Sequence, residues 1–267
     1  MANDHIFLGV DLAGDTGLTG AAYVWEEQDR LACRVESGSF QRQDGLLDLA
    51  ALIGRAQLAA IDQPFAYSES MMRLLGGSAL LESLANRCAS DLSWRRTDIR
   101  MREILKSYGL SVHGVMSPNR CQNIWRALLL AAMCGISREE VCRCTGKIVE
   151  THPRVALARL MPIGIRDQVL NAYKSKDPDG ALEARSAALE EMRRILRLEF
   201  ATSDDVALAI ESDDRFEAVV AAVVAFLHGQ GATEICGYQN ATEPNLAIEG
   251  AAVVPDDQAI ASLKMTS

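Results

Sequence analysis

Ile6-Phe7-Leu8-Gly9-Val10-Asp11 is an unbroken apolar run that ends in a carboxylate. A short continuous apolar run of this kind predicts a strand that is buried on both faces. An ionised carboxylate at the end of such a strand loses favourable hydration unless a cation or a hydrogen-bond network compensates for it. Asp11 is therefore the first candidate for a functional site.

Two later apolar runs end in the same way. Residues 58–61 lead into Asp62, and a proline two positions further on stops strand pairing and turns the chain away. Residues 148–149 lead into Glu150, and Pro153 is placed to open a helix in its first turn. Because ligands of sheet proteins gather outside the strand ends, we expect Asp11 and these two acids to approach one another.

A further group of acids lies on a helix predicted over residues 212–228, where apolar residues recur at helical spacing. Asp214 and Glu217 are three residues apart, so they share a face of that helix. The same face carries small alanine side chains, including Ala218 and Ala221, which would let the helix backbone lie close to a sheet. We therefore expect the helix to bring one of these acids to the strand ends.

Each acid also has an ordinary structural explanation. A strand-end aspartate is often a turn or capping residue that accepts backbone hydrogen bonds. Ser212 followed by Asp213 and Asp214 is also typical of a helix start, with a serine cap and acids near the positive end of the helix dipole. The whole set favours a site, because three strand-end acids are followed by an acid on an alanine-rich helix face.

Seven short motifs extend this pattern along nearly the whole chain: G-V-D-L-A from Gly9, then I-D-Q-P-F, T-D-I-R-M-R, V-E-T-H-P-R, Y-K, D-D-R-F-E-A and E-G-A-A-V-V-P. In this order they resemble the bacterial and archaeal family called domain of unknown function 429, described as predicted nucleases of ribonuclease H fold. The resemblance implies an α/β fold with a ribonuclease H-like mixed sheet. An antiparallel three-stranded meander would be joined by parallel strands, with helices on both faces and a helical insertion.

The resemblance also implies a metal-dependent phosphodiester hydrolase whose catalytic residues are the acids. Asp11, Asp62 and Glu150 would hold two Mg²⁺ or Mn²⁺ ions together with an acid from the late helix, since clustered carboxylates suit hard cations that also bind phosphate. The family usually has aspartate where this chain has Glu217. Whether Asp214 or Glu217 is the helix ligand therefore stays open.

Four further residues are candidates for substrate binding. Arg100 and Arg102 lie in the T-D-I-R-M-R motif, Lys174 lies in Y-K, and His152 lies two residues after Glu150. Basic side chains of this kind contact phosphate oxygens. The ordinary alternatives are a solvated helix face paired with neighbouring acids and a histidine with a purely structural role.

Composition limits the partners. At 267 residues and 49% hydrophobic, the chain is predicted to be a single domain over residues 1–267 with a helical cap insertion over 65–146. A net charge of −9 argues against a protein that coats nucleic acid, so we expect a nucleic acid or a nucleotide-like phosphodiester that is held locally.

The longest apolar run, residues 127–133, is too short to cross a membrane. The polar start and an odd number of irregularly spaced cysteines favour a cytoplasmic protein, and nothing indicates its oligomeric state.

Apolar patterns and turn residues also predict the other strands and helices. The strands predicted over residues 6–12, 18–26 and 31–40 suit an antiparallel meander, and the strand ending at Asp62 should pair in parallel with the first. Helices are predicted over residues 46–55, 97–108, 119–134 and 181–200, and an edge strand over 247–254.

Two other functions are compatible with the sequence. Residues 11–17 are similar to the first phosphate loop of actin-like ATPases and sugar kinases, which would make the protein an ATP-binding phosphotransferase. That superfamily generally has glycine where this chain has Ala13, and the second half that it requires is not visible. The third alternative is a catalytically silent binding protein on the same fold, with which Glu217 and the acidic net charge are compatible.

Overall fold

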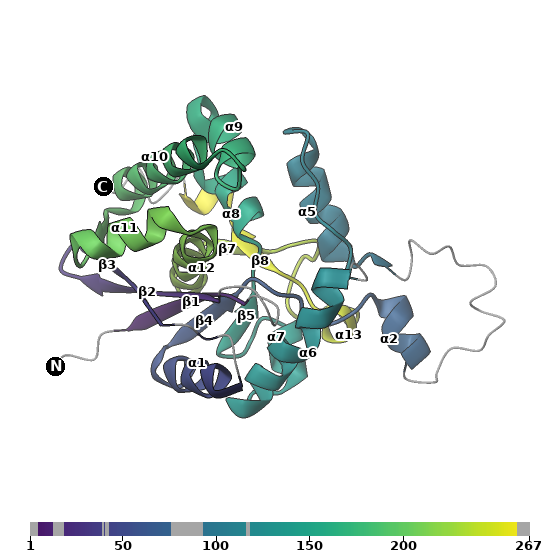
Figure 1. The fold of residues 1–267 in the computed structure, drawn as a ribbon. Coiled ribbons are helices and arrows are strands. Elements are labelled where there is room, and N and C mark those ends of the chain that lie inside the picture. Colours follow the sequence, from purple (N-terminus) through teal and green to yellow (C-terminus); the bar gives the residue numbers. More distant parts are fainter. Residues whose placement is uncertain are drawn as a thin grey trace.

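The computed structural model describes residues 5–12, 19–38, 40, 43–75, 93–115 and 118–260. Within this part of the chain, the core is a mixed sheet of six strands in the order β5-β4-β1-β2-β3-β6 (Figure 1). These strands are β1 (Ile6–Asp11), β2 (Gly20–Glu27), β3 (Arg30–Val35), β4 (Leu58–Ile61), β5 (Ile148–Glu150) and β6 (Leu198–Phe200).

The pairing of the first four strands agrees with the sequence prediction. Strands β1, β2 and β3 form an antiparallel meander, β4 pairs in parallel with β1, and β5 pairs in parallel with β4. Strand β6, parallel to β3, corrects the prediction of one helix over residues 181–200. That helix ends at Leu196 because Arg197 adopts a left-handed conformation with φ 52°, after which the chain joins the sheet.

Helices cover both faces of the sheet (Figure 1). One face is covered by α12, with α8, α9, α10 and α11 beside or above it, and the other by α1 and α6. The helices are α1 (Gln43–Arg55), α2 (Glu69–Leu75), α5 (Arg96–Lys106), α6 (Pro118–Met133), α7 (Arg138–Cys142), α8 (Pro153–Leu160), α9 (Ile163–Ala172), α10 (Pro178–Leu196), α11 (Ser203–Glu211), α12 (Asp213–Gly229) and α13 (Leu246–Glu249). None of the helices described is long and apolar enough to cross a membrane.

The sheet separates two apolar cores, because successive side chains of a strand point to opposite faces. On β1, Phe7 packs in the core on the α12 side, whereas Leu8 and Val10 pack in the core on the α1 side. Gly9 and Asp11 share the face of Phe7, towards α12. A Cβ atom on Gly9 would lie 2.0 Å from the carbonyl oxygen of Ala218, so α12 rests directly on the strand backbone. The predicted close approach of the alanine-rich helix is thus confirmed.

The C-terminal part differs from the predicted edge strand over residues 247–254. Its first residues form the short helix α13, and Gly250 ends that helix with a positive φ of 65°. Only then does β8 (Val253–Pro255) begin, and it pairs antiparallel with β7 (Thr233–Ile235), which the sequence did not predict. A single parallel bridge from Ala252 to Glu150 places this segment beside β5.

Candidate metal site

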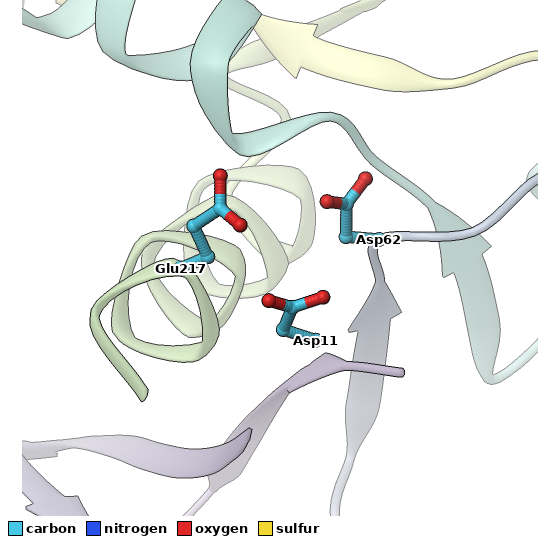
Figure 2. Close-up of side chains that lie close together, drawn as sticks. All are labelled: Asp11, Asp62 and Glu217. Atoms are coloured by element: carbon cyan, nitrogen blue, oxygen red, sulfur yellow. The ribbon is translucent and has the colours of Figure 1, made fainter. Parts of the chain in front are cut away.

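Asp11, Asp62 and Glu217 bring their carboxylates together at one end of the sheet (Figure 2). Asp11 ends β1, Asp62 follows β4, and Glu217 projects from α12. One carboxylate oxygen from each residue lies within 4.8 Å of those of the other two. Asp11 and Glu217 are buried and Asp62 is half-buried, so this group of acids stands at the edge of the core. These three residues are called the acidic triad below.

The strand register explains why the two aspartates meet. Val10 of β1 lies opposite Ile61 of β4, and the Asp62 backbone N–H donates to the Val10 carbonyl at 2.9 Å. The next residues, Asp11 and Asp62, therefore leave the two strands at the same level and on the same face. That face is the one on which α12 lies, and the close contact at Gly9 holds the helix against β1. Glu217 reaches the strand ends for this reason.

The second helix acid lies beside the acidic triad. The negative charge of Asp214 contributes to raising the pKa of Asp11. The backbone of Asp214 crosses β2, where a Cβ atom on Gly20 would lie 2.3 Å from the Asp214 carbonyl oxygen. Of the two acids between which the sequence could not choose, Glu217 belongs to the triad and Asp214 flanks it.

Burial and mutual repulsion make the ionised acids costly. Burial raises the pKa of Asp11 well above its usual value, and Glu217 and Asp62 raise it further because their charges are of the same sign. The pKa of Asp214 is raised to about 6, first by burial and then by Asp213. Such shifts are typical of functional sites, and a bound cation would offset both causes.

Basic and hydroxyl side chains surround Glu217. The buried Tyr173 hydroxyl donates to Glu217 Oε1 at 2.7 Å, and Arg154 Nε donates to the same hydroxyl at 3.2 Å. Lys174 Nζ forms an ion pair with Glu217 Oε2 and lies 4.0 Å from Asp213 Oδ2. Lys174 thus lies at the acids. Arg154 was not singled out, although it ends the V-E-T-H-P-R motif and was within reach of the same reasoning.

Glu150 is not brought to these acids, which changes the predicted ligand set. In the register of β4 and β5 it lies opposite Ile61 and not opposite Asp62, so it points to the other face of the sheet. There its carboxylate accepts hydrogen bonds from Arg95 Nη1 at 2.7 Å and from Nη2 at 2.5 Å. Arg95 is fully buried and also bonds both oxygens of Asp98. The charge of Glu150 is therefore balanced by arginine.

Glu249 of the E-G motif belongs to the same buried network. Its Oε1 accepts from the Tyr238 hydroxyl and from the Arg96 backbone N–H, the latter at 3.2 Å. Its Oε2 accepts from the Glu69 backbone N–H at 3.2 Å, and its carbonyl accepts from Arg95 Nη1 at 3.4 Å. These contacts fasten α2 and the start of α5 to the C-terminal segment. No role was predicted for this acid from the sequence, nor for the buried Arg95 that links it to Glu150.

The other predicted substrate contacts have local partners. Arg100 forms an exposed ion pair with Glu103 at 3.1 Å. The Arg102 guanidinium lies 5.3 Å from the centre of the Trp94 ring. His152 is the N-cap residue of α8 and is half-buried. Arg100 is therefore paired with an acid on an exposed helix face, which was the ordinary structural alternative.

A family model described as "Protein of unknown function (DUF429)" matches residues 9–242. The matched segment contains the whole acidic triad, Lys174 and Glu150, and it stops before Glu249. No curated protein and no solved structure matches the chain.

Proposed function

We propose that this chain, which belongs to the DUF429 family of proteins of unknown function, is a divalent-cation-dependent phosphodiester hydrolase. The observation that carries the proposal is the convergence of Asp11, Asp62 and Glu217, whose carboxylate oxygens lie within 4.8 Å of one another. The meander followed by two parallel strands supports the ribonuclease H-like fold that the sequence motifs implied, and in this interpretation the site lies at the end of β1.

The donor set fits a hard divalent cation. All three donors are carboxylate oxygens, which are the ligands that Mg²⁺ and Mn²⁺ prefer. The acids carry charges of the same sign, and their repulsion contributes to the raised pKa of Asp11; an ion would relieve that repulsion. Asp11, Asp62 and Glu217 would hold the ion, which when bound polarises a phosphate oxygen and acidifies a water molecule. With Glu150 paired to arginine, a second ion would have to depend on Asp214.

The surrounding side chains supply the remaining functions. Tyr173 orients Glu217 through its hydroxyl hydrogen bond, and Arg154 orients Tyr173 in turn. Lys174 and Arg154 are cations beside the acids, so they are suited to bind the phosphate of an anionic substrate. A local pair of cations is compatible with the net charge of −9, which opposes broad binding of a polyanion.

One contact favours a second candidate, a binding protein without catalytic activity. Lys174 already forms an ion pair with Glu217, so an ammonium group offsets part of the negative charge that a metal ion would offset. The ATP-binding alternative rests on residues 11–17, of which 13–17 lie outside the described residues.

The test is Mn²⁺-dependent cleavage of bis-p-nitrophenyl phosphate and of oligonucleotides by the parent and by Asp11→Asn. We expect the variant to lose at least about 100-fold in rate, because a catalytic metal ion lowers the barrier by several kcal/mol. Asp167→Asn, which makes the same chemical change at an exposed position on α9, should keep the parent rate.

Three results would count against the hydrolase. Equal rates for Asp11→Asn and the parent would remove the acidic triad from the chemistry. No binding of Mn²⁺ in a calorimetric titration, with activity indifferent to chelator, would favour the silent binding protein. Thermal stabilisation by ATP without phosphodiester cleavage would favour the phosphotransferase.

A further inference from the structure

We propose that Lys174 and the divalent ion compete for Glu217 Oε2, so that Lys174 is the exchangeable counter-ion of the metal-free protein and is released when the ion binds. This inference rests on the proposed function, since it takes the acidic triad to be the ion's site. It assigns Lys174 a regulatory role towards the ion in addition to any contact with substrate.

The two oxygens of Glu217 are engaged by partners of different mobility. Tyr173, on Oε1, is fully buried, and its hydroxyl also accepts from Arg154. Its backbone carbonyl is fixed as well, because Arg185 Nη1 donates to it at 2.7 Å. Lys174, on Oε2, has a side chain that is 35% exposed, and its four-carbon stem can rotate into solvent. Of the two partners, Lys174 is therefore the one that an incoming cation can displace.

Lys174 interacts favourably with all three acids of the triad, and not with Glu217 alone. Burial by itself would lower the pKa of Lys174, but the charges of Glu217, Asp11 and Asp62 raise it above its usual value. In the opposite direction, Lys174 lowers the pKa of Asp11. An ion held by the same three carboxylates would meet the ammonium at close range, and two cations there repel each other. The Lys174 ammonium and the ion therefore cannot both occupy this position.

A second acid is available to the released ammonium. Asp213 Oδ2 lies 4.0 Å from Lys174 Nζ, and the Asp213 side chain is 44% exposed. Lys174 can therefore move towards solvent and still lie beside Asp213. In that position it would face the phosphate of an approaching substrate, so the residue that weakens ion binding would strengthen substrate binding.

The first measurement is calorimetric titration of Mn²⁺ into the parent, Lys174→Met and Lys176→Met. Methionine is one atom shorter than lysine and removes the charge, and Lys176 is an exposed lysine two residues further along the chain. Loss of the competing ammonium should make the Kd of Lys174→Met at least about tenfold lower than that of the parent. The Kd of Lys176→Met should stay within about twofold, since an exposed charge is screened by solvent and salt. Lys174→Gln gives a second charge-free variant if the methionine variant does not fold.

The second measurement follows the lysine itself. Reductive methylation of the parent is quantified by mass spectrometry at Lys174 and Lys176, with and without saturating Mg²⁺. Release from Glu217 should raise the rate of methylation at Lys174 and leave that at Lys176 unchanged. Equal rates at Lys174 in the two conditions would overturn the proposal.

The outcomes separate this inference from the proposed function. If the parent binds Mn²⁺ and Lys174→Met binds it equally or more weakly, the competition is refuted and the hydrolase proposal stands. If Lys174→Met binds Mn²⁺ and the parent does not, the competition is supported and the ion is excluded from the native activity. If neither protein binds the ion, both proposals fall.

Discussion

Replacing Glu150 by glutamine tests whether this acid serves the fold or the metal site. Both of its carboxylate oxygens accept from the fully buried Arg95, at 2.7 and 2.5 Å. Removing one partner of a buried ion pair typically costs about 3–5 kcal/mol of stability. We expect the lower end, about 3 kcal/mol, because Arg95 keeps its bonds to Asp98 and the amide oxygen of glutamine still accepts one hydrogen bond.

Two assays on the same protein are needed. Urea unfolding in the presence of EDTA should show the loss of stability, and calorimetric titration of the folded variant with Mn²⁺ should give a Kd within about twofold of the parent, because Glu150 lies on the opposite face of the sheet from Asp62. Asp11→Asn is the matched comparison. It should abolish binding of Mn²⁺ and leave the fold intact, since it removes a buried charge from a group of like charges.

Either of two results would show that the structural argument is wrong. A folded Glu150→Gln protein that no longer binds Mn²⁺ would make Glu150 a ligand, as the sequence predicted. A loss of stability below about 1 kcal/mol would mean that the bond to Arg95 contributes no more than an exposed ion pair.

Three further predictions concern neighbouring contacts. Gly9→Ala should cost at least about 3 kcal/mol in a thermal unfolding experiment, or prevent folding, because its Cβ atom would lie 2.0 Å from the Ala218 carbonyl oxygen; a stable variant would contradict the direct contact of helix and strand. Tyr173→Phe removes the hydroxyl that donates to Glu217 and should raise the Kd for Mn²⁺ by about tenfold, as measured by calorimetry, with an unchanged Kd as the contrary result. Burial raises the pKa of Asp214 from 3.8 to about 6, so the folded protein takes up a proton there more readily than the unfolded chain and loses stability as the pH rises through this window. The stability of metal-free Asp214→Asn relative to the parent should therefore increase from about pH 4 to about pH 6 and then level off in urea unfolding, and a decrease would reverse the assignment.

The sheet could be predicted wherever apolar residues run long enough to show a pattern. Strands β1 and β4 and the parallel contact between them followed from apolar runs bounded by turn residues. Strands β6 and β7 were missed because each is three residues long with an acid in the middle, Glu199 and Glu234. Such segments form strands only because the backbone of a neighbouring strand pairs with theirs. Tertiary pairing of this kind leaves no local signal.

The part of the site that the direction of the strands determines could be predicted from the sequence. Asp11 and Asp62 end adjacent parallel strands, and residues at such ends must meet if the strands pair in register. Glu150 also ends a parallel strand, but a run that is buried on both faces does not reveal which face its last side chain takes. An offset of one residue against β4 separated it from Asp62. Tyr173 and Arg154 stood in recognised motifs, yet their roles depend on contacts across 44 and 19 residues that spacing alone cannot supply.

The buried arginine network has a consequence for synthesis on the ribosome. Arg95 contacts one partner 55 residues further along the chain and another 154 residues further along. The nascent polypeptide therefore carries this arginine through the synthesis of 154 further residues before Glu249 is added. During that interval the start of α5 lacks the contacts that would shelter it from chaperones and proteases, and incomplete chains are the species most exposed to aggregation. Chains that end before residue 249 should accordingly be degraded faster in cells than chains that include it.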